Sequence, residues 1–283
     1  MIKKVLVPVD FYSESSDVLA CIGELKNTGL EKVVLLHVVD IYKAQGLAPM
    51  FERNAKEKIE EYKLLLDEMS IESVTHVLYG DVKKTIANVA EEENVDCVIM
   101  GATTSGYIKG RLMGRTTEYI SRTSNKMVLI EKYDTYQDED ELYLKSCSTK
   151  FNRVLFPTDY SESSKRGLSE LEHLKDIIYE LVLVHVIEGA RNPEDLDNKK
   201  EAALKSLYEL GQRFETHTSV EYHVIGGKPS EAINRLAEEK NVTLIAAATH
   251  GNNSFKDILL GSTAENLLRI TLKPVLLIPT GNR

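Results

Sequence analysis

The sequence lacks an excess of positive charge. Its 283 residues include 35 lysines and arginines against 44 aspartates and glutamates, which gives a formal net charge of -9 at pH 7. A surface that binds nucleic acid needs clustered lysine and arginine side chains to neutralise phosphates. No basic stripe runs through this chain, so we expect no nucleic-acid partner.

Paired cysteines and long apolar runs are missing as well. The three cysteines, Cys21, Cys97 and Cys147, form no CxxC pair and are odd in number, which favours a reducing compartment over a disulfide scaffold. The first ten residues, MIKKVLVPVD, contain an apolar run that Pro8 and Asp10 interrupt. Because this run is too short for a signal peptide or a membrane span, we expect a soluble, cytoplasmic protein with no membrane partner.

The Walker A motif GxxxxGK[ST] is also absent, so the usual lysine-plus-metal machinery for phosphoryl transfer is not expected. His37 and His185 lie within apolar runs, and no other histidine, cysteine or carboxylate stands at metal-ligand spacing. We predict that both histidines are satisfied core residues. The sequence therefore assigns neither a metal site nor a catalytic residue.

What the chain does contain is an internal repeat, which is the first feature to seek in a sequence. The matching segments are 3–16 with 152–164, 33–40 with 181–188, 76–100 with 223–247, and 126–130 with 273–277. Each half has the length of a typical domain, whereas solenoid repeats are shorter. We predict one domain at 1–132, a second at 151–283, and an acidic linker at 133–150.

Each half alternates short β-branched runs with amphipathic helical patterns. In the first half, helices are expected at 13–25 with Ser13 as the N-cap, 51–69, 82–93 and 114–123. Continuously apolar strands that alternate with helices are typical of a parallel sheet covered on both faces. Right-handed crossovers then make each half a doubly wound, Rossmann-like α/β domain with five parallel strands.

Ligands of such sheets bind beyond the carboxyl ends of the strands, where the strand order reverses. Asp10 and Asp159 directly follow the first strand of each half. Such a carboxylate is placed to accept hydrogen bonds from a ribose or another polyol, or else to serve as a turn or helix N-cap residue. On spacing alone the two roles are equally favoured.

After the fourth strand, the second half reads Ala247-Ala248-Thr249-His250-Gly251, and Gly261-Ser262-Thr263 follows after nine intervening residues. Glycines let the backbone approach a phosphate closely, and a helix N-terminus offers unpaired N–H groups and a favourable dipole. The pattern predicts an anion site at the carboxyl edge of the sheet.

With these motifs the chain resembles the universal stress protein (UspA-like) family in its tandem form, which has an adenine nucleotide alpha hydrolase-like fold. The family's signature is Gly-x2-Gly-x9-Gly-[Ser/Thr], and residues 248–262 match it except that Ala248 replaces the first glycine. The resemblance implies that Asp159 holds the ribose and that the backbone of Val186 reads the adenine edge. The phosphates would be cradled by Gly251, Gly261, Ser262 and Thr263. The expected site comprises Pro157, Thr158, Asp159, Val186, Ala247, Ala248, His250, Gly251, Gly261, Ser262 and Thr263.

The first half departs further from the signature. Gly101 and Gly114 match its first and third glycines, but Thr104 replaces the second, and Arg115 replaces the serine or threonine. A β-branched residue at positive φ is costly, whereas an arginine beside a helix N-terminus is a good phosphate donor. Altered binding, weak binding and a vestigial site stay open, with a degenerate copy slightly favoured. The corresponding residues are Pro8, Val9, Asp10, Val38, Met100, Gly101, Thr104, Gly114, Arg115 and Thr116.

The leading hypothesis is a stress-response sensor or regulator that binds ATP, ADP or AMP, with or without Mg²⁺. The alternatives are a slow ATPase or nucleotide-cleaving enzyme, in which His250 orients a water, and an interaction scaffold without a ligand. The apolar segments KMVLIEK at 126–132 and KPVLLIP at 273–279 would expose sheet edges if they were unpaired. We expect them to pair the two domains within the chain, and homodimer formation through other faces stays open.

Overall fold

The computed structural model describes residues 1–11, 22–26, 29–44, 47–103, 114–133, 149–189, 193–249 and 260–281. These residues fall into two compact units, which are 1–103 with 114–133 (unit 1) and 149–281 (unit 2). Within the described ranges, no helix is both long and apolar enough to cross a membrane.

Unit 1 is built on a five-stranded sheet. Its strands are β1 (Lys4–Pro8), β2 (Lys32–Asp40), β3 (Glu72–Gly80), β4 (Cys97–Thr103) and β5 (Met127–Tyr133). They lie in the order β3-β2-β1-β4-β5, and every neighbouring pair is parallel. The helices are α2 (Ile41–Ala44), α3 (Ala48–Glu68), α4 (Val82–Glu92) and α5 (Arg115–Thr123).

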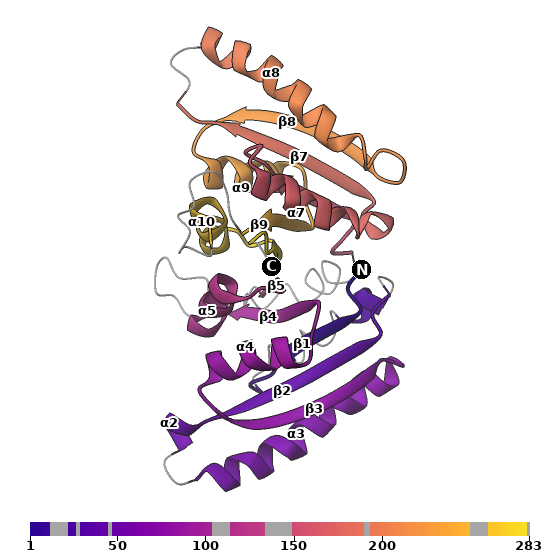
Figure 1. The fold of residues 1–283 in the computed structure, drawn as a ribbon, viewed down its shortest axis with the longest axis vertical. Helices are drawn as coiled ribbons and strands as arrows, with labels where there is room; N and C mark the ends of the chain where they lie inside the picture. Colours follow the sequence, from indigo (N-terminus) through magenta and orange to yellow (C-terminus); the bar gives the residue numbers. More distant parts are fainter. Residues whose placement is uncertain are drawn as a thin grey trace. The chain divides into compact units, whose positions relative to one another are not determined.

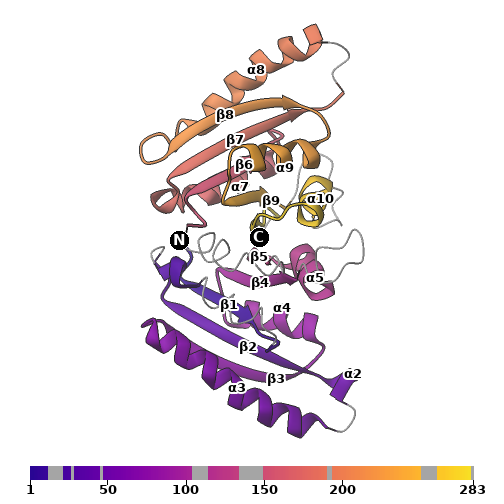
Figure 2. The same cartoon turned by 180° about the vertical axis from the view of Figure 1, so that it is seen from behind.

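Unit 2 repeats this architecture. Its strands are β6 (Arg153–Pro157), β7 (Glu180–Ile187), β8 (Ser219–Gly226), β9 (Leu244–Ala248) and β10 (Val275–Ile278), in the parallel order β10-β9-β6-β7-β8. The helices are α7 (Glu162–Glu172), η2 (Lys175–Ile177), α8 (Pro193–Gly211), α9 (Pro229–Glu239) and α10 (Ser262–Ile270). In each unit, helices cover both faces of the sheet (Figures 1 and 2). The predicted doubly wound α/β fold is confirmed.

The strand order fixes where a ligand pocket can form in unit 2. From β6 the chain steps through β7 to β8 in one direction, and then it returns to β9 and β10 on the other side of β6. Right-handed crossovers place α7 and α8 on one face of the sheet and α9 and α10 on the other. The order therefore reverses between β6 and β9, beside the carboxyl end of β6.

Local sequence sets the helix starts. Asp81 caps α4, because its carboxylate accepts a hydrogen bond from the backbone N–H of Lys84 at 3.0 Å. Ser161 caps α7 in the same way, with a 3.1 Å bond from the N–H of Ser164. Helix α3 begins three residues before its predicted start, since Pro49 is favourable in a first turn. Ser13, the expected cap of the first helix, lies outside the described residues, as do positions 134–148 of the predicted linker.

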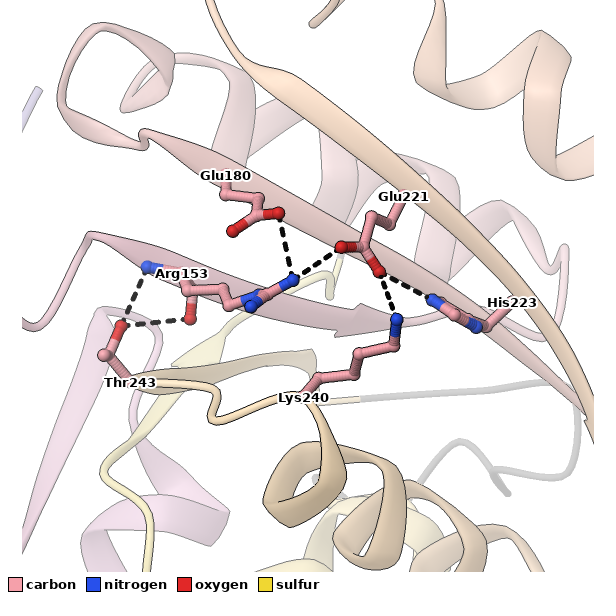
Figure 3. Close-up of polar contacts among 6 residues, drawn as sticks. All are labelled: Arg153, Glu180, Glu221, His223, Lys240 and Thr243. Carbon is pink, nitrogen blue, oxygen red and sulfur yellow. Dashed lines mark hydrogen bonds and ion pairs between the residues drawn. The ribbon is translucent and has the colours of Figure 1, made fainter.

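A polar cluster ties the amino ends of the strands together in unit 2 (Figure 3). Arg153 begins β6 and donates from Nη2 to Glu180 at 3.0 Å and to Glu221 at 2.5 Å. Glu221 also accepts from Lys240 at 2.7 Å and pairs with His223 at 3.0 Å. Hydrogen bonding to Lys240 and His223 lowers the pKa of Glu221 to about 2. This cluster lies at the edge of the sheet opposite the carboxyl ends of the strands.

Candidate functional site

A cavity of about 940 Å³ opens at the carboxyl ends of β6, β7 and β9, next to the first turn of α10. Its volume falls within the usual range of small-molecule sites. Its walls come from strand ends, the loop after β6, one side of α8 and the starts of α9 and α10. The cavity thus forms at the position where the strand order predicts a ligand site.

The loop after β6 contributes Asp159 to the cavity, and local hydrogen bonds define its course. The Asp159 carboxylate accepts from the N–H of Ser161 at 3.0 Å, and the Thr158 hydroxyl accepts from the N–H of Tyr160 at 3.1 Å. The Thr158 hydroxyl also shares a 2.9 Å hydrogen bond with the hydroxyl of Ser164 on α7. Asp159 is therefore a turn residue that also lines the cavity, while Ser161 is the helix cap.

His185 on β7 lines the cavity and also anchors this loop. Its Nδ1 atom lies 2.9 Å from the carbonyl oxygen of Thr158, and its ring packs against Tyr160 with 4.4 Å between centroids. Because a carbonyl oxygen only accepts hydrogen bonds, Nδ1 carries the hydrogen. This bond is the one expected of a satisfied histidine, but the position of the ring at the border of the cavity was not predicted from the sequence.

Ala248 ends β9 at the position where the family signature has its first glycine. It is absent from the residues with positive φ, so an alanine meets no backbone strain there. A β-carbon added to Gly167 on α7 would lie 2.9 Å from the β-carbon of Ala248. The Ala248 methyl group therefore packs against α7 without a clash, since the residue opposite it is glycine.

The first turn of α10 closes the cavity on the side of the predicted phosphate site. Gly261 is the N-cap in an extended conformation, and no side chain caps the helix. Ser262 and Thr263 follow in the first turn and line the cavity. Backbone N–H groups and hydroxyls are thus available where the helix dipole favours an anion.

The cavity brings together nine of the eleven residues predicted for the second half: Pro157, Thr158, Asp159, Val186, Ala247, Ala248, Gly261, Ser262 and Thr263. The other two, His250 and Gly251, lie outside the described residues. Lining residues that were not predicted include Tyr160, Glu188, Lys199, Ala203 and Ser206. Tyr160 carried one usable signal, since it follows Asp159 as Phe11 follows Asp10. The α8 residues carried none, because only tertiary packing brings them to the strand ends.

The equivalent residues of unit 1 also lie around strand ends. Val9, Val38 and Met100 are buried, Asp10 is exposed, and Gly114 is the N-cap of α5. The remaining described positions are Pro8 at the end of β1, Gly101 in β4, and Arg115 and Thr116 in the first turn of α5. Thr104 lies outside the described residues.

One contact distinguishes this first turn from that of α10. The hydroxyl of Thr117 donates to the carbonyl oxygen of Gly101 at 3.2 Å, whereas the repeat places Ala264 at the corresponding position. In unit 1, a side chain of α5 therefore engages the strand end where the signature has its first glycine.

The described residues include no group of three or more histidine, cysteine, aspartate or glutamate side chains that could hold a metal ion.

Fold and cavity define a class: a duplicated doubly wound α/β protein with a small-molecule pocket at the switch point of its second unit. The universal stress protein family profile matches residues 1–132 and 150–279. The chain belongs to this family, in its tandem form.

Individual relatives match one half or the whole chain. A universal stress protein of Methanocaldococcus jannaschii is 27% identical over 166 residues, covering 48% of this chain and 99% of the relative. The universal stress protein YxiE of Bacillus subtilis is 27% identical over 152 residues, covering 45% and 99%. The crystal structure of a universal stress protein from Archaeoglobus fulgidus is similar over 99% of this chain and 97% of its own, with a TM-score of 0.76 and 25% identity.

Proposed function

We propose that this protein binds an adenine nucleotide in the cavity of unit 2 and acts as a cytosolic stress-response sensor or regulator. One observation carries the proposal: a single cavity joins a carboxylate after β6, the backbone end of β7 and the first turn of α10. These are the groups needed for a ribose, a base edge and phosphates, respectively. We assign the ribose to Asp159, the adenine edge to the backbone of Val186, and the phosphates to Gly261, Ser262 and Thr263.

Charge and shape in the cavity support this assignment. The α10 N-terminus presents N–H groups that no side chain caps, and its dipole favours a phosphate over a cation. The walls between Asp159 and α10 are largely apolar, with Ala247, Ala248, Ile233 and Leu260 among them. Such walls suit a planar base whose polar edge meets the backbone.

For unit 1 we propose weaker nucleotide binding than in unit 2, or none. Thr104 and Arg115 depart from the signature, and the Thr117 hydroxyl engages the Gly101 carbonyl at the strand end. We therefore propose one nucleotide per chain, held in unit 2. We propose binding and assign no catalytic residue. An assay of ATP hydrolysis on the same samples tests the alternative of a slow ATPase.

Calorimetric titration with ATP, ADP and AMP, with and without Mg²⁺, tests the proposal. Mass spectrometry of small molecules released from the denatured protein provides an independent readout. We expect about one equivalent per chain, loss of binding in Asp159→Asn, and retained binding in the matched variant Asp10→Asn. A protein that carries no nucleotide and gives no heat with any of the three would refute the proposal. Two equivalents would refute its restriction to unit 2.

A further inference from the structure

Tyr160, which the family signature does not include, has an unusual backbone conformation at the wall of the cavity. Its φ is 62°, in the left-handed region that bulky side chains rarely adopt. Such a conformation persists only where the surrounding contacts determine it, and it is typical of functional sites. Tyr160 is the residue directly after Asp159, so contacts that hold Tyr160 also restrain the stretch of backbone that carries the Asp159 carboxylate.

Two contacts hold the Tyr160 side chain. Its hydroxyl donates to the carbonyl oxygen of Ala203 on α8 at 2.7 Å, and its ring packs against His185 on β7. Burial raises the pKa of the Tyr160 hydroxyl, so the group is a protonated donor at neutral pH. Tyr160, His185 and Ala203 all line the cavity, and the contacts join the loop to both β7 and α8.

His185 fixes the residue on the other side of Asp159. Its Nδ1–H group donates to the carbonyl oxygen of Thr158, and the Thr158 N–H donates to the carbonyl oxygen of Val184 at 2.9 Å. Asp159 thus stands between Thr158, which is bound to β7, and Tyr160, which contacts β7 and α8. A carboxylate held in this way has little freedom to reorient.

Unit 1 carries the same arrangement without the hydroxyl. Phe11 has a φ of 63°, and its ring stacks on His37 at 4.4 Å. The Nδ1 atom of His37 lies 2.8 Å from the carbonyl oxygen of Val9, and burial lowers the pKa of this histidine. The aromatic–histidine pair is therefore a feature of both repeats, whereas phenylalanine has no donor for a bond like that of Tyr160 to α8.

We propose that Tyr160 and His185 are positioning residues that aim the Asp159 carboxylate at the ribose hydroxyls, so that unit 2 selects ribonucleotides over 2′-deoxyribonucleotides. The inference rests on the proposed function. A hydrogen bond from a hydroxyl to a charged carboxylate contributes enough to discriminate roughly tenfold or more. That discrimination requires the carboxylate to be fixed, because a mobile carboxylate or one turned aside binds the ribose less selectively.

The test compares the dissociation constants of ATP and 2′-deoxy-ATP by calorimetry for the full chain. We expect the wild type to bind ATP about tenfold more tightly, and Tyr160→Phe, which copies the unit 1 arrangement, to reduce this ratio to about threefold or less. Phe11→Tyr is the matched control in unit 1, and it should leave the ratio as in the wild type.

The ratio separates positioning from a merely structural role, since general loosening of the cavity weakens both nucleotides alike and leaves the ratio unchanged. His185→Asn is the second variant, because its amide keeps a donor near Thr158 but removes the ring that supports Tyr160. Thermal unfolding checks that each variant is folded. If Tyr160→Phe does not fold, the ratio measured for His185→Asn tests the inference. An unchanged ratio in the folded variants, or a wild type that binds both nucleotides equally, overturns the inference. A wild type that binds neither nucleotide refutes the proposed function instead.

Discussion

At the scale of single residues, Ala248 and Gly167 form a size-matched pair beneath the cavity. The β-carbon that any larger residue would add at position 167 comes within 2.9 Å of the Ala248 methyl group, but it stays 3.5 Å from the Ala248 α-carbon. In the first half, Gly101 stands where the second half has Ala248. The glycine missing from the signature on β9 is thus matched by a glycine on α7.

We predict that Gly167→Ala destabilises unit 2 by about 1–2 kcal/mol, because overpacking outweighs the gain of about 1 kcal/mol in helix propensity. In the Ala248→Gly background the same change should be neutral or stabilising by up to about 1 kcal/mol, since the blocking methyl group is gone. Urea unfolding of the two single variants and the double variant measures both effects. The same sign and size in both backgrounds would contradict the pairing.

At the scale of elements, the charged clusters show how the two repeats have diverged while keeping one topology. In unit 1, Lys4 pairs with Glu93 at 2.6 Å, and His76 pairs with Glu93 at 2.9 Å. In unit 2 the repeat places Lys240 at the Glu93 position, and Glu221 on β8 supplies the carboxylate. Each cluster thus keeps a carboxylate between a basic residue and a histidine, although the element that carries the carboxylate has changed.

The Glu221 cluster leads to a prediction about acid stability. The pKa of Glu221 is lowered to about 2, below its value in an unfolded chain, so its contribution is present above about pH 4.5 and is lost as the pH falls toward 2. We predict that Glu221→Gln lowers the free energy of unfolding by about 1–2 kcal/mol at pH 7, a figure reduced from the full shift because the side chain is partly solvated. Denaturant unfolding from pH 7 to pH 2.5 measures the difference from wild type, which should shrink with acid.

Glu231→Gln is the matched control for that experiment. Glu231 pairs with Lys228 on the surface at 2.7 Å, and exposed pairs contribute little. Its effect should stay within about 0.5 kcal/mol at every pH. A Glu221→Gln difference that did not depend on pH would show that packing, and not the charge, carries the contribution.

The sequence predicted elements better than it predicted contacts. Continuous apolar runs and the repeat sufficed for the parallel strands of both units, because burial on both faces leaves few other arrangements. The strained Tyr160 backbone could not be predicted, since nothing in a tyrosine favours positive φ and the conformation accompanies the packing of its ring against His185, as that of Phe11 does against His37. For the same reason, the sequence did not predict that residues of α8 line the cavity.

At the scale of the whole molecule, two units of one fold carry different residues at equivalent strand ends. Unit 2 has a cavity in which nine predicted site residues meet, and unit 1 has Arg115 and Thr117 where unit 2 has Ser262 and Ala264. The pairing of segments 126–132 and 273–279 stays a prediction. Duplication followed by divergence at the site is consistent with one unit that binds ligand and another that keeps the fold.

This asymmetry can be measured within one chain by hydrogen exchange. A ligand at about 100 times its dissociation constant stabilises the state that binds it by about 2.7 kcal/mol. We predict that saturating ATP slows amide exchange at Asp159 and Tyr160 and in the first turn of α10. Exchange at the equivalent amides of Asp10 and Phe11 should not change, because the unit 1 site lacks the signature serine and its strand end is engaged by Thr117.

Asp159→Asn should remove the protection in unit 2 and thus show that it arises from binding at that site. Equal protection of both loops would mean that the two repeats bind alike, and that Arg115 substitutes for the missing serine as a phosphate ligand.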